Sequence, residues 1–193
     1  KIAIVGAAGS IGQGSARILA RAGYANLLLV DLVRKNETFE ALAKELKDLH
    51  PAVSVTLSHR IRDVKESDFI IAATNAPEAL ITSEDLKPGA IVIDDAQPSD
   101  VSTEVLARED VLVIEAGVVH TKGITSNFNM GLKDREDNFC CLAEVLILAS
   151  ERHTEHYVIH RATLNHVDEI AKKGRALGFS IAKFQNRKEL ISE

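Results

Sequence analysis

The chain has only two cysteines among its 193 residues, Cys140 and Cys141, and they are neighbours. Adjacent cysteines make a poor structural cross-link, so we expect reduced thiols and a cytoplasmic location. No apolar run approaches the roughly 18 residues that a membrane-spanning helix requires, and no signal-peptide pattern is present. The net charge of −5 argues against a general attraction to nucleic acid or to anionic membranes.

Internal repeats, low-complexity linkers and a complete metal-ligand pattern are also missing. His153, His156 and His160 have a spacing that metal ligands can adopt, but no cysteine or carboxylate pattern nearby completes a site, so we expect no metal. The chain has no initiator methionine and starts directly on an apolar segment. We therefore expect a single domain over residues 1–193, in a fragment that lacks an N-terminal region.

A short β-branched run at Ile2–Val5 is followed at once by Gly6, Gly9 and Gly12, and a helical pattern opens at Ser10. Strand, glycine turn and helix in this order are typical of a dinucleotide-binding site, although three glycines alone also suit a tight turn in another α/β protein. The first glycine permits the sharp turn, the second lets the backbone approach a pyrophosphate, and the third lets the helix pack on the strand. The helix N-terminus offers amides and a partial positive charge to the phosphates. The predicted cofactor-binding residues of this turn are Gly6, Ala8, Gly9, Ser10, Ile11 and Gly12.

Short apolar segments alternate with helical patterns along the chain. About six such segments predict an α/β fold with a doubly wound parallel sheet, a Rossmann fold, in the strand order 3-2-1-4-5-6. The expected strands are residues 2–5, 27–30, 53–57, 68–73, 90–93 and 111–114. We expect a long loop over residues 118–134, a buried apolar helix over residues 139–150, and a last helix capped by Asn165.

Residues just beyond the expected strands are candidates for cofactor contacts, because ligands of such sheets lie across the carboxyl ends of the strands. Asp31 closes the second strand, and a carboxylate there can accept hydrogen bonds from ribose hydroxyls, which favours NAD. Arg34 and Lys35 follow, and they either bind a 2′-phosphate, which favours NADP, or are ordinary surface residues. The choice between NAD and NADP stays open.

Small or polar residues also follow two later strands. Thr74, Asn75 and Ala76 come after the fourth strand, where they leave room for the second ribose and the nicotinamide. Gly117 follows the sixth strand and can do the same near the nicotinamide face. The alternative for each of these four residues is an ordinary loop position.

The two cysteines lie in the first turns of a helix. We expect this helix to begin near Asp134 to Asp137 and its buried, apolar part to cover residues 139–150. Cysteines of an apolar helix are often only small hydrophobic residues. A helix N-terminus, however, lowers the pKa of a thiol and favours the thiolate nucleophile, whereas the neighbouring acidic residues oppose this. Glu144 lies three residues after Cys141 on roughly the same face, and a carboxylate on an apolar helix needs a partner.

Several stretches together resemble the aldehyde-forming long-chain acyl-ACP reductases. They are Gly6–Gly12, Leu27–Val30, Ile91–Asp94, Glu115–Val119, Ile170–Phe179 and, above all, Phe139–Glu144. The resemblance implies an NAD(P)H-dependent reductase related to shikimate and amino-acid dehydrogenase-like Rossmann proteins. In that family the cysteine of a Phe-x-Cys-x-Ala-Glu pattern takes the acyl group as a thioester, and hydride then releases an aldehyde.

Cys141 occupies the position of that cysteine, and Cys140 matches a small neighbour. This chain departs from the family in lacking an extra N-terminal region that helps to hold the acyl chain. It also carries Asp31, which suggests NAD, where the family commonly uses NADPH.

The sequence therefore predicts a reductase that converts an acyl thioester, acyl-ACP or acyl-CoA, to an aldehyde through Cys141. His120 follows the sixth strand and either donates a proton to the hemithioacetal oxygen or is an ordinary loop histidine. An acyl carrier protein is a candidate partner, and a homo-oligomer is compatible with the sequence. Two alternatives remain open: an NAD(P)-dependent dehydrogenase of a small hydroxy or amino acid with inert cysteines, and a non-catalytic NAD(P)-binding module.

Overall fold

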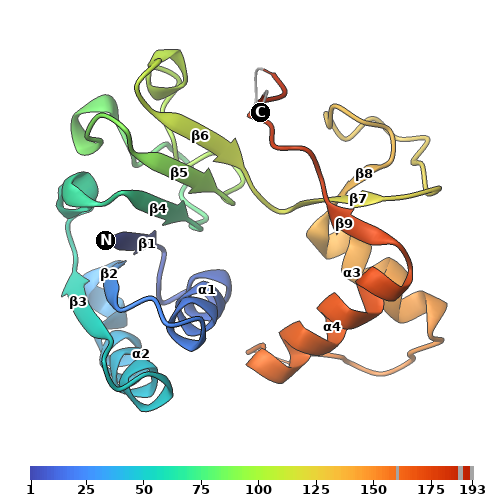
Figure 1. The fold of residues 1–193 in the computed structure, drawn as a ribbon, viewed down its shortest axis with the longest axis horizontal. Coiled ribbons are helices and arrows are strands. Elements are labelled where there is room, and N and C mark those ends of the chain that lie inside the picture. The colour runs from blue at the N-terminus through green and yellow to red at the C-terminus, as the bar shows by residue number, and fades with distance from the viewer. Residues whose placement is uncertain (160, 187–188, 192–193) are drawn as a thin grey trace. The chain divides into compact units, whose positions relative to one another are not determined.

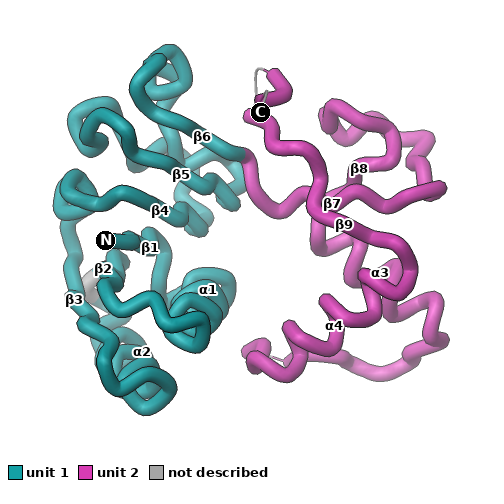
Figure 2. The backbone as a smooth tube through the Cα atoms, viewed as in Figure 1, with its two compact units in different colours: residues 1–114 teal, residues 115–193 magenta. Residues whose placement is uncertain are grey.

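The computed structural model describes residues 1–159, 161–186 and 189–191 (Figure 1). The chain forms two compact units, unit 1 over residues 1–114 and unit 2 over residues 115–193 (Figure 2). Each unit has its own sheet and its own hydrophobic core, and the single domain expected over residues 1–193 stays a prediction.

Unit 1 is organised by a six-stranded sheet in the order β3-β2-β1-β4-β5-β6. Its strands are β1 (Ile2–Val5), β2 (Asn26–Val30), β3 (Ser54–Ser58), β4 (Phe69–Ala72), β5 (Ile91–Asp94) and β6 (Leu112–Glu115). β1 pairs in parallel with β2 and with β4, β2 pairs in parallel with β3, and β4 pairs in parallel with β5. The predicted Rossmann-type sheet and its strand order are confirmed.

The register of these strands gathers the predicted cofactor residues at one edge. Val5, the last residue of β1, lies opposite Val30 of β2 and Ala72 of β4. The glycine turn, Asp31 and the segment from residue 73 onward therefore all leave the sheet at the same carboxyl edge. This is the edge at which ligands of open α/β sheets bind.

The two faces of this sheet are covered differently. α1 (Ser10–Arg21) and α2 (Asn36–Leu49) pack on one face, where Ile4, Leu27 and Leu29 meet apolar side chains of both helices. Ala3, Val5 and Ile70 point to the other face, because successive residues of a strand alternate between faces. That second face is covered by short 3₁₀ segments and loops rather than by long helices. The 3₁₀ segments of the unit are η1 (Val33–Lys35), η2 (Ile61–Glu66), η3 (Ser83–Asp85) and η4 (Val105–Ala107).

Unit 2 contains a three-stranded antiparallel sheet in the order β8-β7-β9 and two helices. Its elements are β7 (Val118–Thr121), β8 (Asp137–Phe139), α3 (Cys140–Ser150), α4 (Leu164–Ala176) and β9 (Phe179–Ile181). The expected loop over residues 118–134 is wrong at its start, because residues 118–121 pair with strands on both sides. The last helix is capped by Thr163, whose side chain accepts a hydrogen bond from the His166 amide, and not by Asn165.

The helix α3 is less buried than its apolar sequence predicts. Only Ala143 and Ile147 are buried, and they pack with Phe179 in the small core of unit 2. Val145 is 59% exposed, and both cysteines are exposed as well. The expected buried helix is therefore wrong, because packing within unit 2 covers one stripe of α3 and leaves other apolar residues uncovered. Within the described ranges, no helix has both the length and the apolar character needed to cross a membrane.

Gly12 and Gly14 of α1 provide a matched test of this packing. A Cβ atom added at Gly12 would lie 2.3 Å from the Gly6 carbonyl oxygen and 2.7 Å from the Ala7 Cα, whereas one added at Gly14 would meet no atom within 4 Å. We expect Gly12→Ala to lower the free energy of unfolding by about 1–3 kcal/mol through overpacking. Gly14→Ala should raise it by up to about 1 kcal/mol, because alanine favours the helix. Chemical denaturation measures both effects, and an equal gain in the two variants would contradict the close contact at Gly12.

Candidate functional site

The glycine turn after β1 has no room for side chains at its three glycines. Gly6 has a φ of +79°, and a Cβ there would lie 2.5 Å from the Ala73 carbonyl oxygen. A Cβ at Gly9 would lie 3.1 Å from the Gly6 carbonyl oxygen, which already accepts a hydrogen bond from the Gly9 amide at 2.9 Å. The turn therefore presents bare backbone at the carboxyl edge of the sheet, as a pyrophosphate requires.

The first turn of α1 has the polarity that a phosphate group needs. Gly9 is the N-cap, so no side chain caps the helix, and the first turn contains no acidic residue. Ser10 and Ile11 are exposed at this end. The first amides of a helix have no partner within the helix and carry a partial positive charge. Together, the bare turn and these amides fit the pyrophosphate of an NAD(P) molecule.

Asp31 lies at the predicted position beyond β2, but its carboxylate already has several partners. Its Oδ2 accepts a hydrogen bond from the Ala8 amide at 2.9 Å, and its Oδ1 accepts one from the Leu32 amide at 2.7 Å. The Lys35 Nζ lies 3.6 Å from Oδ1, and the Asp31 side chain is only 5% exposed. Arg34 is exposed. A paired carboxylate beside Lys35, with Arg34 exposed, is compatible with NAD and with NADP, so the choice stays open.

The loop after β4 is held by a residue that the sequence did not indicate. The buried carboxylate of Asp100 accepts hydrogen bonds from the Thr74 amide, at 3.0 Å, and from the Thr74 hydroxyl. The Thr74 hydroxyl oxygen accepts a hydrogen bond from the Ala76 amide at 3.1 Å, while Asn75 is exposed. Burial raises the pKa of Asp100, and the hydrogen bonds from Thr74 partly oppose this shift. Because the two residues are far apart in sequence, no local pattern could have paired them.

Two further carboxylates, Asp94 at the end of β5 and Asp95 directly after it, lie at the same edge. The buried Asp94 accepts hydrogen bonds from the Ala96 and Asp100 amides, both at 3.3 Å, and from the Ser99 hydroxyl. The pKa of Asp95 is raised, first by burial and second by the negative charge of Asp94. This end of the sheet is therefore acidic, in contrast to the N-terminus of α1.

In unit 2, Cys141 is exposed in the first turn of α3. The helix begins at Cys140 and not near Asp134 to Asp137, because residues 137–139 form β8. The Cys140 amide donates a hydrogen bond to the Gly117 carbonyl oxygen at 2.7 Å, so two of the stretches singled out from the sequence meet here. Gly117 has a φ of +73°, which suits glycine at this turn into β7.

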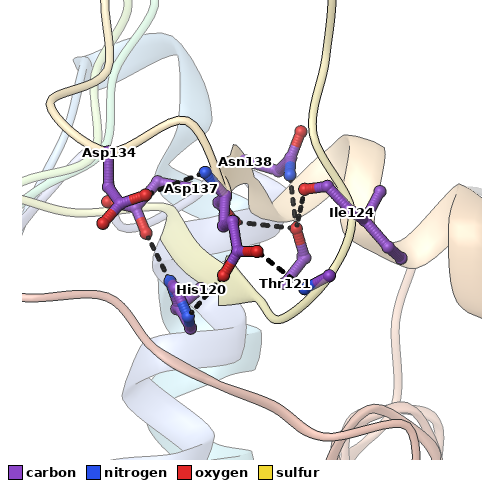
Figure 3. A network of polar contacts seen from close by, with 8 residues as sticks. His120, Thr121, Ile124, Asp134, Asp137 and Asn138 are labelled. Carbon is purple, nitrogen blue, oxygen red and sulfur yellow. Dashed lines mark hydrogen bonds and ion pairs between the residues drawn. The ribbon is translucent and has the colours of Figure 1, made fainter.

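His120 of β7 lies between two carboxylates (Figure 3). Its Nδ1 is 3.1 Å from Oδ1 of Asp137, the residue opposite it on β8, and its Nε2 is 3.4 Å from Oε2 of Glu136. The Asp137 side chain is only 4% exposed, whereas the His120 side chain is about one-third exposed. A protonated imidazole at this place has an acceptor at each nitrogen, which keeps the ring in one orientation.

The two ends of the loop over residues 122–136 are hydrogen-bonded to each other next to His120. The Thr121 amide donates to the Glu136 carbonyl oxygen at 2.8 Å, and the Gly123 amide donates to the Glu136 carboxylate at 3.1 Å. The loop borders an open cavity of about 350 Å³ whose lining includes Phe128, Arg135 and Asp137. Asp137 therefore both lines the cavity and bonds the His120 ring.

The predicted residues therefore fall into two groups. Unit 1 brings the glycine turn, Asp31 and residues 74–76 to one edge of its sheet. Unit 2 carries Gly117, His120 and Cys141. Among the described residues, which do not include His160, no group of three or more His, Cys, Asp or Glu side chains could hold a metal ion.

Comparisons with known proteins give a family match and one long alignment. A family model described as Shikimate / quinate 5-dehydrogenase matches residues 1–118. Aminotransferase PigE of Serratia sp. is 28% identical over 186 residues, which make up 93% of this chain and 21% of that protein. The chain thus spans about a fifth of the length of this curated relative.

Two solved structures are similar at lower identity. The nucleotide-binding domain of glutamyl-tRNA reductase from Thermoplasma volcanium is 20% identical with a TM-score of 0.43, over 58% of this chain and 72% of that one. Lactate dehydrogenase from Eimeria maxima with NADH and oxamate is 19% identical with a TM-score of 0.41, over 60% of this chain and 43% of that one.

The acidic edge predicts a specific dependence of stability on pH. Because the pKa of Asp95 is raised above its ordinary value of 3.8, the folded protein binds more protons than the unfolded chain just above that value, and stability falls as the pH rises through this window. We expect Asp95→Asn to raise the free energy of unfolding at pH 7, and the gain to shrink as the pH falls toward 4. Thermal unfolding at several pH values measures this.

Asp110 is the matched control, because the neighbouring Arg108 lowers the pKa of this exposed carboxyl. Asp110→Asn should slightly lower stability at pH 7, and the loss should disappear as the pH falls through the lowered pKa. Destabilisation by Asp95→Asn at pH 7 would contradict the cost assigned to the Asp95 charge.

Proposed function

We propose that this chain, which belongs to the Shikimate / quinate 5-dehydrogenase family, reduces an acyl thioester to an aldehyde with NAD(P)H. Family membership establishes an oxidoreductase-type NAD(P)-binding domain in this chain. The finer activity is supported chiefly by one observation, the exposed thiol of Cys141 in the first turn of α3. A cysteine that served only as a small hydrophobic residue would be buried.

The residues of unit 1 provide the cofactor half of the proposed reaction. The bare glycine turn and the first amides of α1 would hold the pyrophosphate, and Thr74, Asn75 and Ala76 would border the second ribose. When bound in its reduced form, the nicotinamide supplies a hydride for the acyl carbonyl carbon. The buried Asp100 contributes by holding Thr74 in place through two hydrogen bonds.

Cys141 provides the covalent half. The Cys141 thiol loses its proton, and the thiolate attacks the carbonyl carbon of the acyl thioester to form a new carbon–sulfur bond. The original carbon–sulfur bond breaks, and the leaving thiolate of CoA or of an acyl carrier protein takes up a proton in place of the one that Cys141 lost. Reduction of the enzyme-bound acyl group gives a hemithioacetal on Cys141. Its collapse breaks the carbon–sulfur bond, releases the aldehyde and returns the free thiol.

His120 is the candidate proton donor to the hemithioacetal oxygen. Its support is the pair of carboxylates at its two ring nitrogens, which lets a protonated ring keep a fixed orientation. Its strand, β7, pairs directly with β8, and β8 leads into α3. The imidazole and the thiol therefore come from consecutive elements of one small unit.

A second candidate function is direct oxidation or reduction of a small hydroxy or amino acid by NAD(P), with both cysteines inert. The family match favours it, because the residues matched, 1–118, include neither Cys141 nor His120. The two candidates differ in one chemical respect: only the thioester mechanism places an acyl group on the protein.

We expect Cys141→Ala to abolish formation of an acyl adduct and to lower the rate of aldehyde formation by on the order of a thousandfold or more. The protein is incubated with acyl-CoA without cofactor, and intact-mass spectrometry measures the adduct. Cys140→Ala is the matched control, since it removes the neighbouring thiol, and it should keep the adduct. Affinity for NADPH should be the same in both variants.

An adduct that persists in Cys141→Ala, or an unchanged rate, would contradict the covalent mechanism. Oxidation of a small hydroxy acid by a protein that never forms an adduct would support the second candidate instead.

A further inference from the structure

The peptide groups on both sides of Ala8, in the middle of the glycine turn, are held by side chains. The Ala8 amide donates to Oδ2 of Asp31, and the Ala8 carbonyl oxygen accepts from Nε2 of Gln13; both distances are 2.9 Å. Asp31 comes from the end of β2, whereas Gln13 comes from α1. The turn that faces the pyrophosphate is thus fixed from the strand side and from the helix side.

Gln13 is itself oriented by Arg17, the buried member of an ion pair with the partly exposed Glu45. Its Oε1 accepts a hydrogen bond at 2.8 Å from Nη2 of Arg17, which is only 3% exposed. Arg17 also forms two hydrogen bonds with the Glu45 carboxylate of α2, at 2.8 and 3.0 Å. A guanidinium offers only donors, so Gln13 must turn its amide oxygen toward Arg17 and its NH₂ group toward Ala8. The orientation of Gln13 is therefore chemically determined.

The Asp31 carboxylate, on the strand side of the turn, also has partners for both of its oxygens. Oδ2 accepts a hydrogen bond from the Ala8 amide, and Oδ1 accepts one from the Leu32 amide. The Lys35 ammonium lies beside Oδ1. With its side chain almost fully covered, Asp31 is placed to support the turn. This differs from the role that its position after β2 suggests, which is acceptance of ribose hydroxyls.

We propose that Asp31 and Gln13 are positioning residues that clamp Ala8, so that the amides at the start of α1 are preset for the pyrophosphate of the dinucleotide. We call Asp31, Gln13, Arg17 and Glu45 the Ala8 clamp. NADH and NADPH share the pyrophosphate, so the clamp supports both cofactors alike. In consequence, Asp31 does not select between them. The inference depends on NAD(P) binding alone and is independent of the proposed thioester chemistry.

The decisive variant is Gln13→Glu, because a carboxylate still accepts the hydrogen bond from Arg17 but cannot donate to the Ala8 carbonyl oxygen. Asp31→Asn is its counterpart, since an amide can accept from only one of the two backbone N–H groups through its oxygen. Asp48→Asn, on the exposed carboxylate near the end of α2, is the matched control. Fluorescence titration gives the dissociation constants for NADH and NADPH, and thermal unfolding without cofactor reports the stability of each variant.

We expect Gln13→Glu and Asp31→Asn each to raise both dissociation constants by on the order of tenfold, with the ratio between NADH and NADPH unchanged. Asp48→Asn should bind as the unaltered protein does. The melting temperature of Gln13→Glu should not fall, because its pairing with Arg17 is retained.

Two results would overturn the proposal. If Asp31→Asn weakens NADH alone and leaves or improves NADPH, Asp31 is a ribose acceptor. If Gln13→Glu binds both cofactors normally, the clamp has no part in binding. Should Gln13→Glu lower the melting temperature, Gln13→Met removes the same hydrogen bond without added charge, and unchanged affinity there would equally refute the clamp.

Discussion

The close approach of Gly12 to Gly6 is the contact on which unit 1 depends. It lets the first turn of α1 rest directly on the glycine turn, with no side chain between the two backbones. Gly6 in turn lies against the Ala73 carbonyl group beyond β4, so the same few atoms join β1, α1 and the end of β4. Any side chain at these places would separate the helix from the sheet edge, and the amides of α1 would no longer face the region beyond β1.

The contact between Gly12 and Gly6 does not by itself fix the orientation of the peptide groups in the turn. Polar side chains do this. Asp31, Gln13 and Asp100 each fix a peptide group at the carboxyl edge, and two of them are almost fully covered. A buried polar group is costly unless it is hydrogen-bonded, so such residues are useful only where the backbone must be held in one position. Unit 2 shows the same device, because the buried Asp137 holds the His120 ring. In both units, buried carboxylates thus hold in position the groups that are candidates for contact with a ligand.

Local sequence was sufficient for the parts of the fold that depend on local chemistry. The Ile2–Val5 run followed by spaced glycines predicted the strand, the turn and the helix, because each depends on neighbouring residues. Strand order followed from the alternation of elements and from the general handedness of their connections. The same motif singled out the residues of the turn, and their part in cofactor binding stays a prediction.

The rest could not be predicted because it depends on residues that are distant in sequence. Asp100 meets Thr74 only after β4 and β5 have paired, and β7 becomes a strand only because β8 and β9 flank it. The apolar sequence of α3 indicated a buried helix, but hydrophobicity alone does not say how many sides of a helix find a partner. The exposure of Cys141, on which the proposed chemistry depends, is a consequence of that incomplete coverage.

Charge varies along the carboxyl edge of the six-stranded sheet in a way that bears on how a dinucleotide can lie there. The N-terminus of α1 is electropositive and contains no acidic residue in its first turn, whereas Asp94, Asp95 and Asp100 lie at the carboxyl end of β5 and in the loop that follows it. Phosphate groups are attracted to the first end and repelled by the second. The carboxylates cost stability, as the raised pKa values of Asp95 and Asp100 indicate, but they oppose any binding mode with the pyrophosphate at the β5 end. Retention of a destabilising charge next to a ligand edge is the expected compromise when orientation of the ligand matters more than stability.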